Sequence, residues 1–263
     1  MGEYSINNEN TRFTGLVTSS SSPVGTSCQL RIESGPANRY RLAQMDDYSR
    51  LPRKKFLYRP PVSLILQARV SDRSLPGTWG FGFWNDPFAL GMGIQGAGLR
   101  MPSLPQAAWF FFGSPKNDLS FHSSSPANGL MASVFSSQPV PLFLVPFGLL
   151  IIPFLFTKKT ARLVRQFASR FIHDEYTILS HDVTQWHTYH LDWLTDSVNF
   201  RVDDQLVYTG KNSPRSPLGL VIWVDNQFAA FSANGSIRYG TQENPTPAVL
   251  EIRNLMITVP DSL

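Results

Sequence analysis

Alternating apolar and polar residues define the clearest elements of this chain, and the best example is the stretch 186–208. Its first part places His187, Tyr189, Leu191 and Trp193 on one face and mainly polar residues on the other, which is the period of two of a β-strand. Two further short runs follow the same alternation and are separated by a polar turn. The stretch predicts three antiparallel strands, whose apolar face needs a second sheet to cover it.

Turn residues separate further strand-like runs through most of the chain. The predicted strands outside the central stretch lie at residues 27–33, 39–43, 54–58, 62–72, 79–84, 107–113, 119–123, 130–135, 218–224, 236–239 and 249–259. Many short antiparallel strands predict an all-β fold, a two-sheet antiparallel jelly-roll sandwich. We expect residues 1–26 to be a loose lead-in, and residues 27–263 to form a single jelly-roll domain interrupted by a hydrophobic and helical insertion at about 138–181.

This insertion differs in composition from the rest of the chain. No residue from Leu119 to Thr157 carries a formal charge apart from His122, and residues 139–156 are almost wholly apolar. Residues 157–172 then place apolar side chains at helical spacing with basic side chains on the other faces, which predicts a basic amphipathic helix. Prolines interrupt the apolar run and the flanking strands belong to one domain, so the pattern argues against a single bilayer crossing.

Three roles are open for the insertion. It covers a core, it contacts a membrane, or it forms a lid over an apolar ligand or a contact with another subunit. In the membrane role, the apolar run enters the bilayer and the basic helix binds anionic headgroups. The residues that would contact the membrane are Leu142, Phe143, Phe147, Leu150, Phe154, Lys158, Lys159, Arg162 and Arg165.

The charge of the chain is concentrated in the same region. The formal net charge is +4, from 23 basic and 19 acidic residues, and five of the basic residues lie within residues 157–172, which contain no acid. The remainder is nearly neutral, so this is a local basic patch. The helix carries too few aromatic residues for base stacking, and we expect no nucleic-acid partner.

Cysteine content and the N-terminus indicate the compartment. The single cysteine, Cys28, has no internal disulfide partner, as is usual in a reducing compartment. The first residues lack a basic region followed by an apolar run, so no signal peptide is visible. We expect a cytoplasmic protein, peripheral at the membrane if the insertion contacts lipid.

The central stretch also resembles a known family. Residues 186–207 are similar to the W-H-T-Y-x-x-x-W-x-x-D-x-V-x-F-x-V-D-x-x-L-V segment of the concanavalin A-like lectins and glucanases, and of glycoside hydrolase family 16 in particular. Residues 77–84 resemble the strand that precedes the active-site region of that family, and residues 249–257 resemble its closing strand. The resemblance covers most of residues 60–258 and implies a concanavalin A-like sandwich with a concave face that binds sugar.

The catalytic motif of family 16, E-x-D-x-x-E, is absent. Its two Glu serve as nucleophile and acid/base, and a retaining mechanism needs their carboxyls about 5 Å apart. The only Glu between residues 34 and 242 is Glu175, and no Glu has an Asp two positions later. The region where the motif is expected offers Asp118 and His122 instead, which share a face of a regular strand and could serve as acid and base. Asp86 and Asp225 are further candidates for a rearranged catalytic site.

Aromatic and amide residues provide candidates for ligand binding. Tryptophan rings stack on the apolar faces of sugars, and Asn, Gln and Asp bond hydroxyls; the alternative is that the rings fill the core and the polar residues turn the chain. For Trp186 and Trp193 we expect the core role, and Asp225 stands out because a carboxylate at the end of an apolar strand needs a partner. The ligand-binding candidates are Trp84, Trp109, Trp223, Asn226 and Gln227.

No set of His, Cys and acidic residues has the spacing of a metal site, and we expect neither a metal nor another cofactor. Some family members carry a structural calcium, but no local cluster of acidic residues indicates one here. We therefore expect a divergent family 16-like protein that binds carbohydrate or an apolar small molecule. The alternatives are an enzyme with a rearranged Asp/His site, acting on a glycan or an apolar metabolite, and a structural assembly module.

Overall fold

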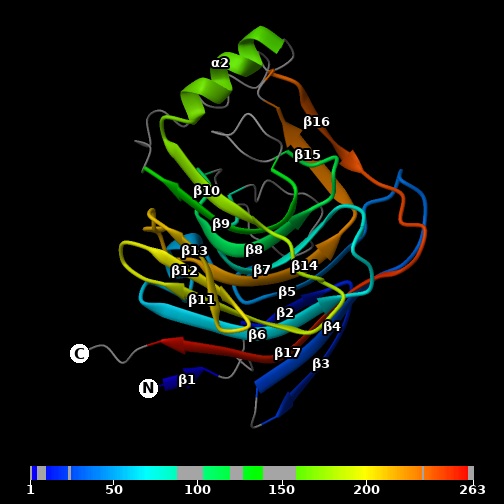
Figure 1. Cartoon of the computed structure of the whole chain (residues 1–263), viewed down its shortest axis with the longest axis vertical. Coiled ribbons are helices and arrows are strands. Elements are labelled where there is room, and N and C mark those ends of the chain that lie inside the picture. The colour runs from blue at the N-terminus through cyan, green and yellow to red at the C-terminus, as the bar shows by residue number, and fades with distance from the viewer. Residues whose placement is uncertain are drawn as a thin grey trace.

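The structure is a computed structural model, and it describes residues 2–4, 10–22, 25–87, 103–118, 127–138, 158–232 and 234–259. Two large antiparallel β-sheets face each other, and one α-helix of more than one turn lies in the described ranges (Figure 1). The predicted two-sheet jelly-roll sandwich is thereby confirmed. Several predicted features fall outside these ranges: the strand at 119–123 with His122, and the apolar run with Leu142, Phe143, Phe147, Leu150 and Phe154.

The first sheet has eight strands, in the order β13-β12-β11-β6-β17-β4-β3, with β1 paired to β17. Its strands are β1 (Gly2–Tyr4), β3 (Leu16–Ser22), β4 (Gly25–Ile32), β6 (Val62–Val70), β11 (His187–Trp193), β12 (Val198–Val202), β13 (Gln205–Gly210) and β17 (Ala248–Val259). The three predicted strands of the central stretch are β11, β12 and β13. Asp203 and Asp204 both have positive φ, 50° and 65°, as a two-residue hairpin turn with right-handed strand twist requires.

The second sheet has seven strands, in the order β10-β9-β8-β7-β14-β5-β2. Its strands are β2 (Arg12–Thr14), β5 (Leu42–Asp46), β7 (Thr78–Trp84), β8 (Ala107–Gly113), β9 (Gly129–Ser137), β10 (Ile172–Leu179) and β14 (Gly219–Asp225). A separate hairpin consists of β15 (Gln227–Phe231) and β16 (Ile237–Thr241). The helices are η1 (Arg53–Lys55), a single 3-10 turn, and α2 (Lys158–Ala168).

The main core lies between the two sheets. Alternate residues of β7, β8, β9 and β14 point inward and meet the inward residues of β6, β11 and β17. Trp79 and Phe112 stack there with ring centroids 5.4 Å apart, and Trp193 is fully buried. Trp193 therefore has the predicted core role. Trp186 does not, because it lies on the outer face of the eight-stranded sheet, beneath the guanidinium groups of Arg69 and Arg253.

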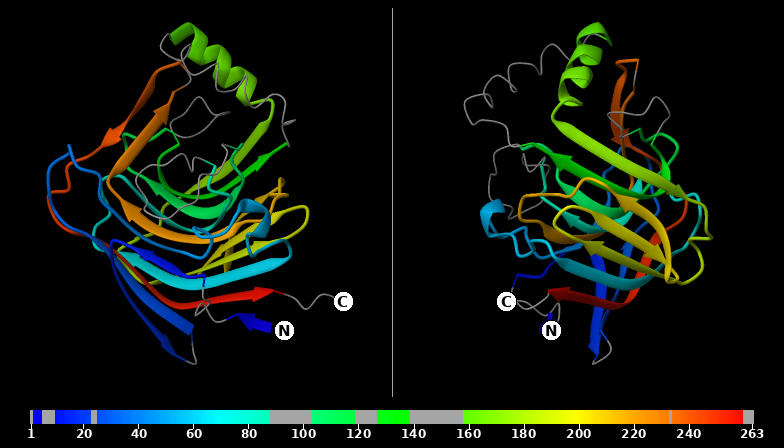
Figure 2. Two further views of the ribbon diagram at one scale, coloured as in Figure 1. Left: turned by 180° about the vertical axis from the view of Figure 1, so that it is seen from behind. Right: turned by 60° about the vertical axis from the view of Figure 1, so that its left-hand side comes forward.

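The seven-stranded sheet curves, and α2 and the β15–β16 hairpin stand on its concave side (Figures 1 and 2). The start of α2 contacts the turn of this hairpin, since an Arg162 guanidinium nitrogen donates to the carbonyl of Asn234 at 3.3 Å. A Cβ on Gly235 would overlap the carbonyl of Lys158, so this contact requires glycine. The hairpin thus fixes the position of the helix over the sheet.

The structure differs from the sequence-based prediction in three places. Residues 12–14 and 16–22 are not a loose lead-in but strands, because their backbones pair with β5 and β4. The predicted helix ends at Ala168, and the residues from Ile172 onward form β10, whose backbone pairs with β9. The predicted strand at 54–58 is a 3-10 turn followed by one bridge at Tyr58.

Candidate functional site

The concave face of the seven-stranded sheet carries a cluster of aromatic side chains. Trp84 ends β7, Trp109 lies in the middle of β8, and Trp223 lies near the end of β14. All three belong to a second apolar cluster, on the opposite side of the sheet from the main core. The strand alternation explains this, because the inward residues Phe83 and Phe110 are neighbours of Trp84 and Trp109 in sequence.

The three tryptophan rings are in contact. The ring centroids of Trp84 and Trp109 are 5.7 Å apart, and those of Trp109 and Trp223 are 5.4 Å apart. The ring centroid of Phe111 lies 5.4 Å from that of Trp109 and 5.7 Å from that of Trp223. The ring centroid of Phe135 lies 6.3 Å from that of Trp109. The tryptophans that the sequence offers as ligand candidates thus form one continuous aromatic surface, which we call the tryptophan face.

Two glycines of β7 form the floor beneath these rings. A Cβ on Gly80 would lie 2.7 Å from the Cη2 atom of Trp223, and a Cβ on Gly82 would lie 2.6 Å from the Cα of Trp109. Gly82 also has a φ of +148°, which side-chain-bearing residues rarely adopt. The Gly-Phe-Gly-Phe alternation of β7 therefore places bulky residues in the core and leaves room for the indole rings on the concave side.

The indole nitrogens of this face differ in their hydrogen bonding. Trp223 Nε1 donates to the hydroxyl of Thr78 at 2.9 Å. The Nε1 atoms of Trp84 and Trp109 are buried, and neither has a hydrogen-bond partner among the described residues. The same holds for Nε1 of Trp79 in the main core, so this feature does not distinguish the concave face.

The concave side of β8 lacks the groups for hydrolysis. Its pairing with β7 and β9 is regular, so its outward residues are Ala107, Trp109 and Phe111. None of these side chains can transfer a proton or attack a sugar. No carboxylate therefore lies on the concave side of this strand.

Asp225 forms an internal hydrogen-bond network at the edge of the tryptophan face. Its Oδ1 accepts from the Thr78 amide at 3.1 Å, the Thr78 hydroxyl at 2.9 Å and the Gln227 amide at 3.1 Å. The Tyr40 hydroxyl donates to Oδ2 at 3.4 Å. Burial raises the pKa of Asp225 to about 7, and these hydrogen bonds lower it only in part. The sequence predicts that this carboxylate has a partner, and its partners are donors of the protein itself.

Asn226 is also enclosed by the protein. Its Oδ1 accepts from the Arg41 amide at 2.8 Å, and its Nδ2 donates to the carbonyls of Arg39 at 2.9 Å and Gln242 at 2.8 Å. Both amide hydrogens and the amide oxygen are thus bonded, and the residue has no exposed surface. Gln227 takes part in the described contacts through its backbone amide.

Of the acidic catalytic candidates, Asp86 lies far from Asp225. Thr78, whose hydroxyl bonds Asp225, is the first residue of β7, and Asp86 follows the last residue of this strand. At ~3.3 Å per residue, β7 spans about 20 Å, and this length separates Asp86 from Asp225. Asp118 is 9% exposed; its backbone pairs with β15, and its Oδ1 accepts from the Ala127 amide at 3.4 Å. His122, its predicted partner, lies outside the described residues.

The basic helix is present, but its faces differ from the prediction. Lys158, Lys159 and Arg162 are exposed, whereas Arg165 is buried, with 8% exposure. Phe167, one of the apolar residues at helical spacing, is 53% exposed. Among the described residues, no helix is long and apolar enough to cross a bilayer, and no group of three or more His, Cys, Asp or Glu is placed to hold a metal ion.

Residues that the sequence does not single out complete the site. Phe111 and Phe135 extend the tryptophan face, and Tyr48 packs edge-on against Trp84 at 6.0 Å. Phe111 could have been found, because it follows Trp109 by two positions on a strand and must share its face. Tyr48 lies in a loop after β5, and no local pattern predicts its contact.

Comparisons with known proteins give structural neighbours only. No protein-family model matches the sequence, and no curated protein matches it. A Bacillus licheniformis beta-glucanase is 12% identical, with a TM-score of 0.47 over 98% of this chain and 97% of that chain. A glycoside hydrolase family 16 endo-glucanase from Bacteroides ovatus is 8% identical, with a TM-score of 0.49 over 92% of this chain and 85% of that chain. A second family 16 protein of Bacteroides ovatus, solved with a product, is 8% identical, with a TM-score of 0.49 over 98% and 99%.

The family named by the sequence resemblance is thus also found among the solved structures similar to this chain. The jelly-roll fold itself follows from the strand order and registers described above.

Proposed function

We propose that this protein binds a carbohydrate on the tryptophan face and does not hydrolyse it by the two-carboxylate route. The observation that carries the proposal is the continuous aromatic surface on the concave side of the sheet, formed by Trp84, Trp109, Trp223 and Phe111.

The geometry of the face suits a ring-shaped ligand. Trp84 and Trp109 are partly exposed, and the centroids of their rings lie 5.7 Å apart. Sugar rings present C–H groups on their faces, which can stack on exposed indole rings.

The spacing of Asp46 and Asp225 argues against hydrolysis by this pair. A retaining glycosidase needs two carboxyls about 5 Å apart, and an inverting one needs about 6.5–9.5 Å. Asp46 on β5 lies opposite Val221, four residues from Asp225 along β14, or about 13 Å along the strand. Both carboxylates are also held by internal donors.

Titration with neutral β-linked glucose oligosaccharides tests the proposal. We expect saturable binding by calorimetry, weakened about tenfold or more in Trp109→Ala because the stacking surface is lost. Trp109→Phe keeps a smaller aromatic ring, and its affinity should lie between those of the wild type and Trp109→Ala. No new reducing ends should appear on prolonged incubation.

The matched control is Trp186→Ala, which removes a tryptophan from the outer face of the other sheet. Its affinity should equal that of the wild type. Equal losses in both variants, or no binding of any oligosaccharide tested, would refute the carbohydrate proposal. Release of reducing ends would refute its non-hydrolytic part.

A second candidate function, contact with an anionic membrane, is favoured by the exposed face of α2. Leu163 and Phe167 are 63% and 53% exposed, and the exposed basic residues Lys159, Arg162 and Arg170 lie on or directly after the same helix. An interfacial helix combines apolar and basic groups in this way. The predicted contacts at Leu142, Phe143, Phe147, Leu150 and Phe154 lie outside the described residues.

Liposome flotation tests this candidate. With vesicles containing about one-third phosphatidylserine, the Leu163→Glu/Phe167→Glu variant should bind about tenfold less than the wild type, since it loses apolar contact and gains repulsion. Leu206→Glu is the control, because Leu206 is similarly exposed, at 58%, but lies on β13. Wild-type protein that stays with the unbound fraction would exclude the candidate.

A further inference from the structure

A pocket of about 410 Å³ opens at one end of the sandwich, away from the tryptophan face. Phe112 lines it and points to the opposite side of β8 from Trp109 and Phe111. The residues around it are Arg73, Phe112, Leu130, Leu179, Ser180, His181, Asp182 and Val183. Small-molecule sites commonly have volumes of about 300–1,000 Å³, so the pocket is large enough for a small organic molecule.

His187 lies behind the pocket and makes a hydrogen bond with each ring nitrogen. Nδ1 is 2.6 Å from Oδ2 of Asp203, and Nε2 is 3.0 Å from the carbonyl oxygen of Asp182. Both partners are acceptors, so each nitrogen must carry a hydrogen for both bonds to form. The second oxygen of Asp203 accepts from the Thr188 amide at 2.9 Å, which fixes the carboxylate. Both ring nitrogens of His187 are thus occupied, and neither is left for a ligand.

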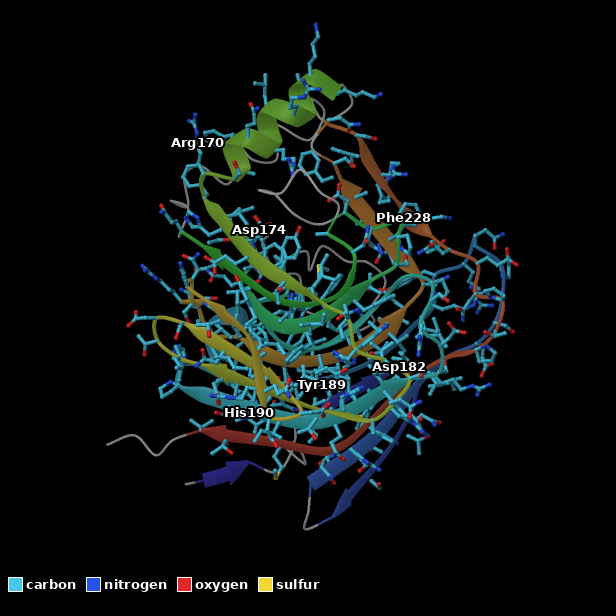
Figure 3. The ribbon with its side chains drawn as sticks, in the orientation of Figure 1. Arg170, Asp174, Asp182, Tyr189, His190 and Phe228 are labelled. Atoms are coloured by element: carbon cyan, nitrogen blue, oxygen red, sulfur yellow. The ribbon has the colours of Figure 1, made fainter. Side chains whose placement is uncertain are left out.

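His181 lines the pocket itself and contacts Tyr189 of β11, which is labelled in Figure 3. Its Nε2 is 2.7 Å from the Tyr189 hydroxyl, and Tyr189 is only 2% exposed. That hydroxyl makes no other hydrogen bond within the described residues, so its hydrogen is best placed on the bond to Nε2. The hydrogen of the neutral His181 ring then lies on Nδ1, the nitrogen that remains for a ligand.

The surroundings of His181 favour the neutral ring. Its ring centroid is 4.5 Å from that of His187, and a second positive charge there would be repelled. Burial, followed by the charge of His187, lowers the pKa of His181, while Asp203 and Asp182 oppose this effect.

The charged groups at the mouth neutralise each other. Arg73 Nε donates to Oδ1 of Asp182 at 2.9 Å, and the Thr184 amide and hydroxyl donate to the same oxygen at 3.1 and 2.7 Å. Arg73 and Thr184 hold the pKa of Asp182 well below its usual range. The pocket therefore has apolar walls, a balanced ion pair, Ser180 and one neutral N–H donor. An anion would meet the Asp182 carboxylate, and a cation would meet the His181 N–H and the Arg73 guanidinium.

We propose that this pocket is a second ligand site, which takes a neutral apolar molecule through a carbonyl or similar oxygen that accepts a hydrogen bond from His181 Nδ1. The proposal does not depend on carbohydrate binding at the tryptophan face, because the two sites lie on opposite sides of β8 and share none of the residues named for them.

Three naphthalene probes test the proposal: 2-acetylnaphthalene, 2-ethylnaphthalene and 2-naphthoate. By equilibrium dialysis, the acetyl compound should bind about tenfold more tightly than the ethyl compound, as expected for one hydrogen bond, and the anion should bind most weakly. The acetyl compound should also shift the His181 ring nitrogen signals in the NMR spectrum. The preference for acetyl over ethyl should vanish in His181→Phe.

Two further variants keep the test decisive if His181→Phe is poorly folded. Val183→Trp fills the pocket and should abolish binding of both neutral probes, and Tyr189→Phe should reduce the acetyl preference several-fold because the ring loses its fixed hydrogen position. Trp109→Ala should leave probe binding unchanged, whatever it does to oligosaccharide binding. Equal affinity for the acetyl and ethyl compounds, loss of binding in Trp109→Ala, or the absence of saturable binding would overturn the proposal.

Discussion

Replacing Asn226 with Ala is expected to destabilise the protein by about 3 kcal/mol. The residue has no exposed surface, and its amide bonds one backbone N–H and two backbone carbonyls from the segments before β5 and after β16. Removing it takes the side-chain partner from the Arg41 amide and the Gln242 carbonyl, whereas the Arg39 carbonyl still accepts from Arg41 Nη1 at 3.1 Å. Urea unfolding followed by tryptophan fluorescence measures the loss as a shift of the midpoint.

Asn226→Asp separates this structural role from ligand binding. The change keeps the acceptor for Arg41 but points the second oxygen at two carbonyl oxygens, so it should cost as much as Asn226→Ala. Gln227→Ala is the control, because Gln227 contributes a backbone amide and should change stability by less than ~0.5 kcal/mol. An Asn226→Ala protein with wild-type stability and lost ligand binding would mean that Asn226 contacts the ligand after all.

Alternation is enough to predict the sheets where one face is apolar. On β11, Tyr189, Leu191 and Trp193 are buried while the residues between them are partly exposed, as the period of two requires. Alternation does not predict a strand that has few apolar residues. Residues 16–22 are largely Thr and Ser, and they form β3 because the free edge of β4 supplies hydrogen-bond partners, which no local pattern reveals.

The helix boundary is wrong for a related reason. Phe171 and Ile172 continue the helical spacing, but the backbone of residues 172–179 pairs with β9, and this tertiary pairing determines the structure there. The charge of Arg165 predicts that its side chain lies on the exposed, polar side of the helix, yet the residue is buried. Sequence spacing gives the faces of a helix but not which face the protein covers.

The candidate site is predictable in its aromatic part and not in its polar part. Trp84, Trp109 and Trp223 follow from strand alternation once their strands are recognised, and they do meet. Asp225 stands out in the sequence because a buried carboxylate needs a partner, but the partners are Thr78 and Tyr40, far away in sequence. Sequence shows that a buried polar group must be satisfied, but only the fold shows whether the protein or a ligand satisfies it.

The second large predicted effect on stability concerns Asp225, where replacement by Ala and replacement by Asn should change the free energy of unfolding differently. Asp225→Ala removes the acceptor for two amides and two hydroxyls and should cost about 3 kcal/mol at pH 7. Asn keeps an oxygen for the three donors at Oδ1 and resembles the protonated carboxyl, so Asp225→Asn should be close to the wild type near pH 4 and more stable than the wild type at pH 7. Urea midpoints of the three proteins measure the difference.

The dependence on pH gives the sharper test of Asp225. Burial raises its pKa from 3.8 to about 7, so between these values the folded protein holds a proton that the unfolded chain has lost. Stability should therefore fall as pH rises through this window, by up to about 1.4 kcal/mol per pH unit from this group. Asp47 is also buried, with its pKa raised to about 7, and adds a slope of the same sign in every variant.

The contribution of Asp225 is thus the difference in unfolding free energy between the wild type and Asp225→Asn, measured from pH 4.5 to 7.5. As pH rises, Asp225→Asn should become more stable relative to the wild type, because the variant has no carboxylate to ionise in the buried position. A constant difference across the range would mean that Asp225 is ionised throughout in the folded protein. Its three donors would then outweigh burial, and the carboxylate would be a permanent charge beside the tryptophan face.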